Sequence, residues 1–208
     1  KKCKMKKTKK VLTALLLVTS TWLAKAQTCP SNSCSVPACE FVCNGSFEII
    51  TAPPTGPNQI ANACGWFNAN PSKTPDLLST TATGNVAIPC NLSGSLTAAN
   101  TGSVCAHFIA HTSAIFAWHE RIGSNLTSTL TAGVTYEISF YLALASGSNY
   151  NADNVGINID EIANPSNSSG VLIANTSTQT IGWTKYSFTY TPFFGGENRL
   201  TIGAWGSF

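Results

Sequence analysis

Residues 155–160, with the sequence Val-Gly-Ile-Asn-Ile-Asp, decide the fold class. Apolar side chains alternate there with small or polar ones, and this two-residue period is typical of a half-buried β-strand. The same alternation recurs in residues 136–142 and 186–191. No stretch shows a helical period, and the Asn, Ser, Gly and Pro residues between the runs favour turns over helices. The pattern predicts an all-β chain.

Eight short runs are the expected strands. They are Phe47–Ile50, Val86–Ile88, Val104–Ile109, Thr135–Leu144, Val155–Ile159, Val171–Ala174, Trp183–Thr191 and Leu200–Trp205. Many short strands without helices predict a β-sandwich or a barrel. The length of 208 residues fits a single domain.

The N-terminus has the features of a secretory signal peptide. Lysines between positions 6 and 10 precede the apolar run Val11–Leu23, and Ala24–Ala26 fits the small-residue cleavage rule. Met5 is the expected start, with an upstream read-through before it. We therefore predict that residues 1–26 are removed and that the protein is secreted or held at the cell surface.

Removal of this segment would change the sign of the net charge of the protein from positive to negative. It holds eight of the twelve basic residues and none of the nine acidic ones, so four cations remain and the net charge falls to near −5. Four scattered cations do not form the basic face that nucleic acid or an anionic bilayer requires. The apolar run of 13 residues is too short to cross a bilayer. The composition thus predicts no nucleic-acid partner and no membrane span.

Cysteine usage agrees with export. Outside the expected signal peptide, residues 27–43 form a Cys-rich leader whose four cysteines are expected to make two local disulfides. Zinc is the rival interpretation, but the chain has no C-x2-C pair and no His near the leader. The sequence does not determine which cysteines pair with each other. Because their number outside the signal peptide is odd, one cysteine has no partner among the others. The seven cysteines are Cys29, Cys34, Cys39, Cys43, Cys64, Cys90 and Cys105.

The sequence offers no catalytic motif. It has no G-x-S-x-G elbow, no phosphate-cradling glycine loop and no H-E-x-x-H. His107 lies on the expected strand Val104–Ile109, and His111 follows four residues later. Four residues of strand span about 13 Å, which is too far for both to bind one metal ion, so we expect unrelated strand and loop histidines. The adjacent pairs His119-Glu120 and Asp160-Glu161 do not converge by themselves. We expect the protein not to be an enzyme.

The segment Asn44-Gly45-Ser46-Phe47-Glu48, followed by Gly65-Trp66, resembles the opening of carbohydrate-binding jelly-roll modules of the galactose-binding-like superfamily. The order of later segments, from Phe41 to the C-terminus, resembles a group of secreted Bacteroidetes surface proteins with gliding-type or type IX sorting domains. The resemblance implies a jelly-roll sandwich of two antiparallel sheets over 44–208. It also implies a non-catalytic surface module that binds carbohydrate or mediates adhesion. A structural spacer with no ligand of its own is the alternative.

Two departures from this group affect the prediction. Its members usually end in a further aromatic-rich strand, so we expect the last strand and a C-terminal domain or sorting tail to be missing here. An edge at 46–50 or 200–205 would then lie unpaired. Related modules often hold a structural Ca²⁺ between an early Glu and a late Asp. Glu48 and Asn44 match the first part of such a site, but the late Asp is absent, so the predicted Ca²⁺ site is incomplete.

A sugar site needs aromatic faces together with amide, carboxylate or guanidinium groups. Tyr150, in a polar loop, and Trp118 are the candidate aromatic residues. Asn149, Asn151 and Arg121 are the candidate polar partners. The resemblance implies that Trp66 packs in the core instead.

Overall fold

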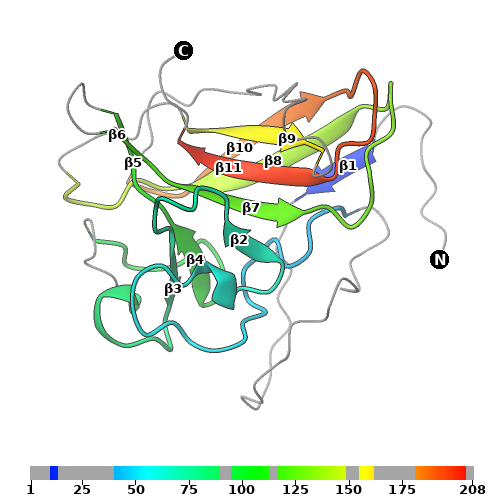
Figure 1. Ribbon diagram of the computed structural model, residues 1–208. Coiled ribbons are helices and arrows are strands. Elements are labelled where there is room, and N and C mark those ends of the chain that lie inside the picture. The colour runs from blue at the N-terminus through cyan, green and yellow to red at the C-terminus, as the bar shows by residue number, and fades with distance from the viewer. Residues whose placement is uncertain are drawn as a thin grey trace.

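The computed structural model describes residues 10–13, 40–89, 95–112, 117–148, 155–161 and 181–204. These residues form strands and two short 3-10 turns, and the predicted all-β class is confirmed (Figure 1). The strands are β1 Lys10–Thr13, β2 Trp66–Asn68, β3 Asp76–Ser79, β4 Val104–His107, β5 Ala110–Thr112, β6 Ala117–His119, β7 Arg121–Asn125, β8 Tyr136–Leu142, β9 Val155–Asp160, β10 Thr184–Tyr190 and β11 Arg199–Ala204. The turns are η1 Ile60–Asn62 and η2 Gly84–Val86.

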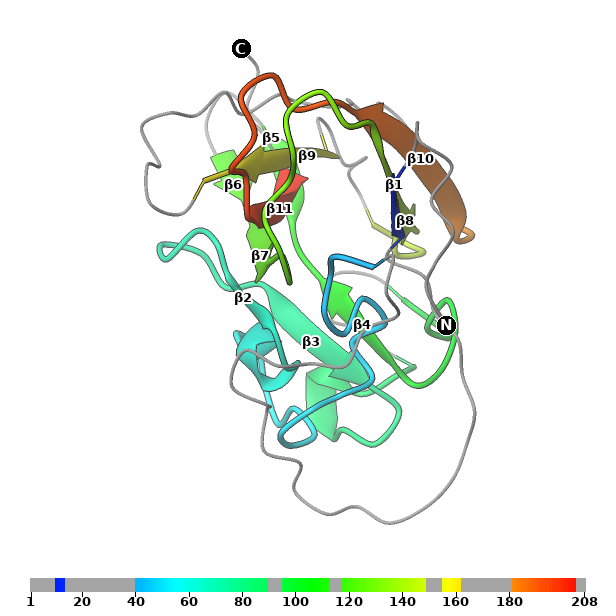
Figure 2. The ribbon, with the colours of Figure 1, turned by 90° about the vertical axis from the view of Figure 1, so that its right-hand side faces the viewer.

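Two larger sheets form opposing layers (Figure 2). One has the order β2-β7-β11-β9 and is antiparallel throughout. The other has the order β1-β8-β10, in which β8 and β10 are antiparallel and β1 joins β8 in parallel. The pairs β3–β4 and β5–β6 are separate antiparallel ribbons. The expected antiparallel sandwich is thus present, with one parallel edge strand.

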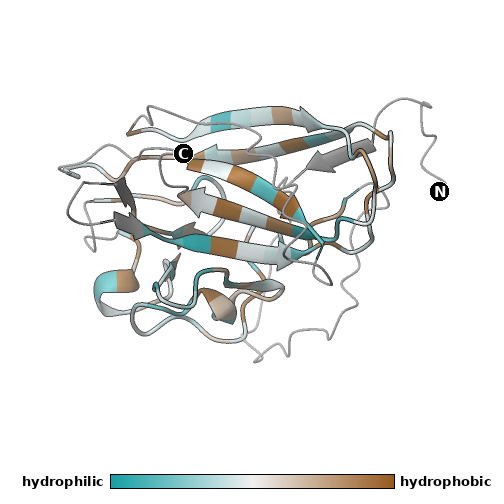
Figure 3. Ribbon diagram, turned by 45° about the horizontal axis from the view of Figure 1, so that its top comes forward, coloured by the Kyte–Doolittle hydropathy of each residue, from teal (hydrophilic) through white to brown (hydrophobic). Residues whose placement is uncertain are grey.

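The main core fills the space between the two layers. Ile157 and Ile159 enter it from β9, and Tyr136 and Ile138 from β8, each at most 2% exposed. The alternation of hydropathy along these strands is visible in Figure 3. The two-residue period therefore predicts these strands correctly, because one face of each strand is buried in the core.

Several expected strands differ from the structure. Phe47–Ile50 is not a strand: Asn44 and Phe47 have positive φ angles of 55° and 65°, and these make a turn. Ile50 only forms an isolated bridge. Val86 belongs to η2 rather than to a strand. The run 171–174 lies outside the described residues.

The expected free edge at 200–205 is also corrected. β11 lies in the middle of its sheet and pairs with β7 on one side and β9 on the other.

Among the described residues, no helix is long and apolar enough to cross a membrane.

Candidate functional site

The Asn44 side chain organises the turn that opens the folded region. Its Nδ2 donates to the carbonyls of Ile49 and Cys64, at 2.9 and 3.0 Å, and its Oδ1 accepts the N–H of Ile49 at 2.9 Å. The Asn44 carbonyl accepts the indole N–H of Trp66 at 2.9 Å. Asn44 thus serves a structural role, since its side-chain amide and its carbonyl bond to the protein.

The two aromatic residues of the same segment pack together. The rings of Phe47 and Trp66 lie 4.5 Å apart, and Trp66 is only 4% exposed. Trp66 is therefore a core residue, as the sequence resemblance implies. It is unsuited to stacking on a ligand.

Glu48 connects this turn to β4. Its Oε1 accepts the N–H groups of Ser103 and Val104, and its Oε2 accepts the Ser103 hydroxyl, each at 2.9 Å. A Cβ on Gly102 would lie 2.3 Å from Glu48 Oε1, so glycine is needed for this approach. Hydrogen-bond donors therefore surround the carboxylate.

These contacts do not fit the predicted Ca²⁺ site. A cation at Glu48 would face N–H donors, whereas Ca²⁺ needs six or more oxygen ligands. Asn44 Oδ1 already accepts a backbone N–H. In the described ranges, no group of three His, Cys, Asp or Glu side chains is placed to hold a metal.

Chelation is therefore expected to leave the stability of this turn unchanged. With excess EDTA, the Tm should stay within about 1 °C of the untreated protein, because no Ca²⁺ bond is lost. Differential scanning calorimetry with EDTA, and with Ca²⁺ restored, checks this. A Ca²⁺-dependent rise of several degrees would contradict it.

The predicted sugar-binding residues are only partly described. Tyr150, Asn149 and Asn151 lie outside the described residues. Trp118 lies in β6, at the register position opposite His111 of β5. Arg121 begins β7 and donates from Nε to the carbonyl of Ala204 at 3.0 Å.

Glu120 and His119, which precede Arg121 in the chain, differ in their surroundings. Glu120 is 1% exposed, and both its oxygens accept hydrogen bonds, from Thr74 and from the Ile109 N–H. Burial lowers the pKa of His119, and the charges of Arg121 and Lys73 lower it further. His119 therefore favours its neutral form. Glu120 acts as a buried acceptor for neighbouring loops.

Sequence reasoning missed one pair, Asp76 with His107. These residues lie opposite each other on β3 and β4, and His107 Nδ1 is 3.0 Å from Asp76 Oδ2. Asp76 Oδ1 accepts the Asn58 N–H at 2.7 Å. The pair ties the loop around Asn58 to β4.

The cysteines of the described residues are Cys43, Cys64 and Cys105. Cys43 and Cys64 are disulfide-bonded. Cys105 is buried in a small core cluster with Leu78 and Val86. The remaining predicted disulfide cysteines, Cys29, Cys34, Cys39 and Cys90, lie outside the described residues.

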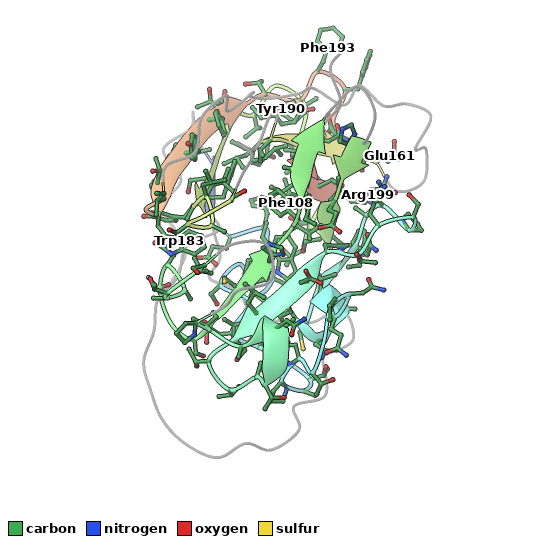
Figure 4. All side chains as sticks on the ribbon, turned by 90° about the vertical axis from the view of Figure 1, so that its left-hand side faces the viewer. Phe108, Glu161, Trp183, Tyr190, Phe193 and Arg199 are labelled. Atoms are coloured by element: carbon green, nitrogen blue, oxygen red, sulfur yellow. The ribbon has the colours of Figure 1, made fainter. Side chains whose placement is uncertain are left out.

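Among the residues that the structure describes, the most exposed large apolar side chains lie in the loop between β10 and β11. Phe193 and Phe194 are 84% and 83% exposed. Their ring centroids are 4.7 Å apart at an interplanar angle of 87°. Figure 4 shows Phe193 projecting outward from this end of the molecule. We call these two residues the aromatic tip.

The backbone beneath the aromatic tip is firmly held. Gly133 N–H donates to the Pro192 carbonyl at 2.8 Å, and Gly196 N–H donates to the Leu130 carbonyl at 3.0 Å. Gly195 has φ +78°, and a Cβ there would lie 2.7 Å from the Ala132 nitrogen. These contacts hold the loop that presents the two exposed rings.

Buried polar groups support the same loop. Tyr190 donates its hydroxyl to Glu197 Oε1 at 2.8 Å, and Glu197 is 7% exposed. Burial raises the pKa of Tyr190, and the hydrogen bond to Glu197 raises it further. Arg199 makes a two-pronged contact with Asp160, at 2.6 and 2.7 Å. These contacts fix both ends of the segment that carries the tip.

Comparison with family models, curated proteins and solved structures found no match to this chain. The resemblance to galactose-binding-like modules therefore stays a prediction.

Proposed function

We propose that this protein is an exported, non-catalytic surface module that binds carbohydrate through the aromatic tip. The observation that carries the proposal is the pair Phe193 and Phe194, exposed by more than four fifths on a fixed loop. A jelly-roll module of the galactose-binding-like type is the corresponding architecture, and the all-β fold of antiparallel sheets is compatible with it.

An exposed pair of large apolar residues lowers the solubility of a protein. Its presence on a rigid loop therefore favours a binding role. The faces of aromatic rings attract the C–H faces of sugars, and full burial of a Phe side chain contributes about 1.5–3 kcal/mol. Because the loop is already ordered, binding would cost little conformational entropy. The aromatic tip is thus suited to weak, reversible binding of a surface glycan.

Charge indicates the class of glycan. The carboxyl carbon of Glu161 lies 3.9 Å from where a Cβ of Gly196 would be, so an acidic group flanks the tip loop. The chain after residue 26 has a net charge near −5. Electrostatic repulsion disfavours sulfated or sialylated ligands. We therefore expect neutral glycans, with the Glu161 carboxylate accepting hydrogen bonds from sugar hydroxyls.

A glycan array with the exported protein tests this proposal. Binding should be saturable, should favour neutral over anionic glycans and should persist in EDTA, because Asn44 and Glu48 do not fit a Ca²⁺ site. Absence of binding to any glycan at protein concentrations up to about 1 mM, the weak end of specific binding, would favour a structural spacer.

A further inference from the structure

Three basic side chains gather where β7 begins, beside β6 (Figure 1). They are Lys73 in the loop between β2 and β3, His119 at the end of β6 and Arg121 at the start of β7, and each is partly exposed. Burial lowers the pKa of His119, and the positive charges of Arg121 and Lys73 lower it further. A charge has this effect only from a short distance, so both cations lie beside the imidazole.

Hydrogen bonds hold the loop that carries Lys73 against these strands. The Ala69 N–H donates to the Arg121 carbonyl at 3.0 Å. Asn70 Nδ2 donates to the His119 carbonyl at 2.8 Å. The Lys73 N–H donates to the Asn70 carbonyl at 2.9 Å, which closes the turn. The fold therefore sets the positions of the three basic residues through backbone contacts.

The carboxylate that lies between two of them in the chain is directed inward. Glu120 is 1% exposed, and its oxygens accept the N–H groups of Thr74 and Ile109. Ala110, which lies opposite His119 on β5, carries no charge. Arg121 Nε donates to a β11 carbonyl, and this bond fixes its guanidinium group. The three basic side chains thus make this surface locally positive in a chain with few cations.

His119 supplies a second observation. Its Nε2 is buried and has no hydrogen-bond partner in the part of the chain that the structure describes. Buried polar atoms without a partner are rare in proteins, and they commonly lie where an ion or a water molecule binds. Because Lys73 and Arg121 flank the imidazole, electrostatic attraction favours an anion at this place.

We propose that Lys73, His119 and Arg121 form a binding site for one phosphate group, either free or carried by a small ligand as a monoester. A doubly charged phosphate matches the two cations, and charge-assisted hydrogen bonds from Arg and Lys are strong. The site lies at the opposite end of β11 from the aromatic tip, because Arg121 pairs with Gly203 whereas the tip loop precedes Arg199. The inference goes beyond glycan binding and does not depend on it.

Isothermal titration calorimetry with inorganic phosphate, at constant ionic strength and neutral pH, tests the site. We expect saturable binding in the millimolar range. Arg121→Gln should weaken it at least about tenfold, because a charge-assisted hydrogen bond is lost, and Lys73→Gln about threefold or more. Lys185→Gln is the matched control, since Lys185 is exposed on β10, outside the cluster.

Two further arms of the titration define the ligand. Glycerol phosphate that binds more tightly than inorganic phosphate would assign the site to a monoester, and weaker binding would assign it to free phosphate. The double variant Phe193→Ser with Phe194→Ser should keep its affinity for phosphate, because the aromatic tip is not part of this site. The outcome therefore separates this proposal from the glycan proposal.

Nuclear magnetic resonance of the His119 imidazole gives a readout that a loss of stability does not mimic. Phosphate at saturation should raise the pKa of His119, because the anion offsets the repulsion from Arg121 and Lys73. Binding then takes up protons, so the affinity for phosphate should increase as the pH falls. In Lys73→Gln, the pKa of His119 should already be higher without phosphate.

Three results would overturn the proposal. The first is equal phosphate affinity in Lys73→Gln and Lys185→Gln at unchanged Tm; Lys73→Gln also decides the matter if Arg121→Gln lowers the Tm. The second is an unchanged pKa of His119 at saturating phosphate. The third is binding of acetate as tight as that of phosphate, which would show that the site does not select a doubly charged group.

Discussion

Gly203→Ala should destabilise the protein by about 4 kcal/mol or more, because a new Cβ has no space between β11 and β7. It would lie 2.3 Å from the Glu120 carbonyl oxygen and 2.8 Å from Arg121 Cα, which are backbone atoms. Gly203 also has φ +153°. β11 is an inner strand of its sheet, so a shift there disturbs its pairing with both β7 and β9.

Thermal unfolding measures this effect. For a domain of this size, we expect the Tm to fall by roughly 8–16 °C. Gly56→Ala is the matched control, because its Cβ would meet no atom within 4 Å and its φ is not positive. Equal melting temperatures for the two variants would show that β11 and β7 are not packed as closely as described.

Glu120→Ala should be the second most damaging substitution. Glu120 is fully buried, and its carboxylate accepts the Ile109 N–H at 2.6 Å and the Thr74 N–H at 3.1 Å. Alanine would leave both buried donors without an acceptor, which costs about 3 kcal/mol or more. Glu120→Gln should lie between the wild type and Glu120→Ala, because one amide oxygen can still accept but the amide N–H₂ faces a donor.

Urea unfolding followed by fluorescence gives the free energies. Glu137→Ala is the control, because Glu137 is an outward, half-buried residue of β8. If Glu120→Ala unfolds at the same urea concentration as Glu137→Ala, then Glu120 does not hold the Thr74 and Ile109 loops.

Periodicity predicted the strands that bury one face. β9, β8 and β10 coincide closely with the alternating stretches, because the inward residues of each strand form the core. β7 has no such alternation. Its Gly123 is fixed by tertiary contact, since a Cβ there would lie 2.5 Å from the Phe67 ring of β2.

The turn at 44–48 could not be read from local pattern. Phe47 is a bulky residue in a positive-φ conformation, which sequence propensity disfavours. Its packing on Trp66, 19 residues later, stabilises that conformation. The Asp76–His107 pair similarly depends on the register of β3 and β4.

The aromatic tip also escaped sequence reasoning. Two adjacent Phe residues usually indicate core, and the signal that could have revealed exposure is the Gly195-Gly196 pair that follows them. The exposure itself depends on backbone contacts with Leu130, Ala132 and Gly133. Those contacts are set by tertiary structure.

The most direct test of the central claim is a calorimetric titration of the best neutral glycan from the array against a double variant, Phe193→Ser with Phe194→Ser. The control is Ile181→Ser, which removes an apolar side chain that is 67% exposed and lies before β10, at the opposite end of that strand from the tip loop. We predict at least about a tenfold loss of affinity in the double variant, with the control and the Tm unchanged. Unchanged affinity in the double variant would contradict the assignment of glycan binding to the aromatic tip.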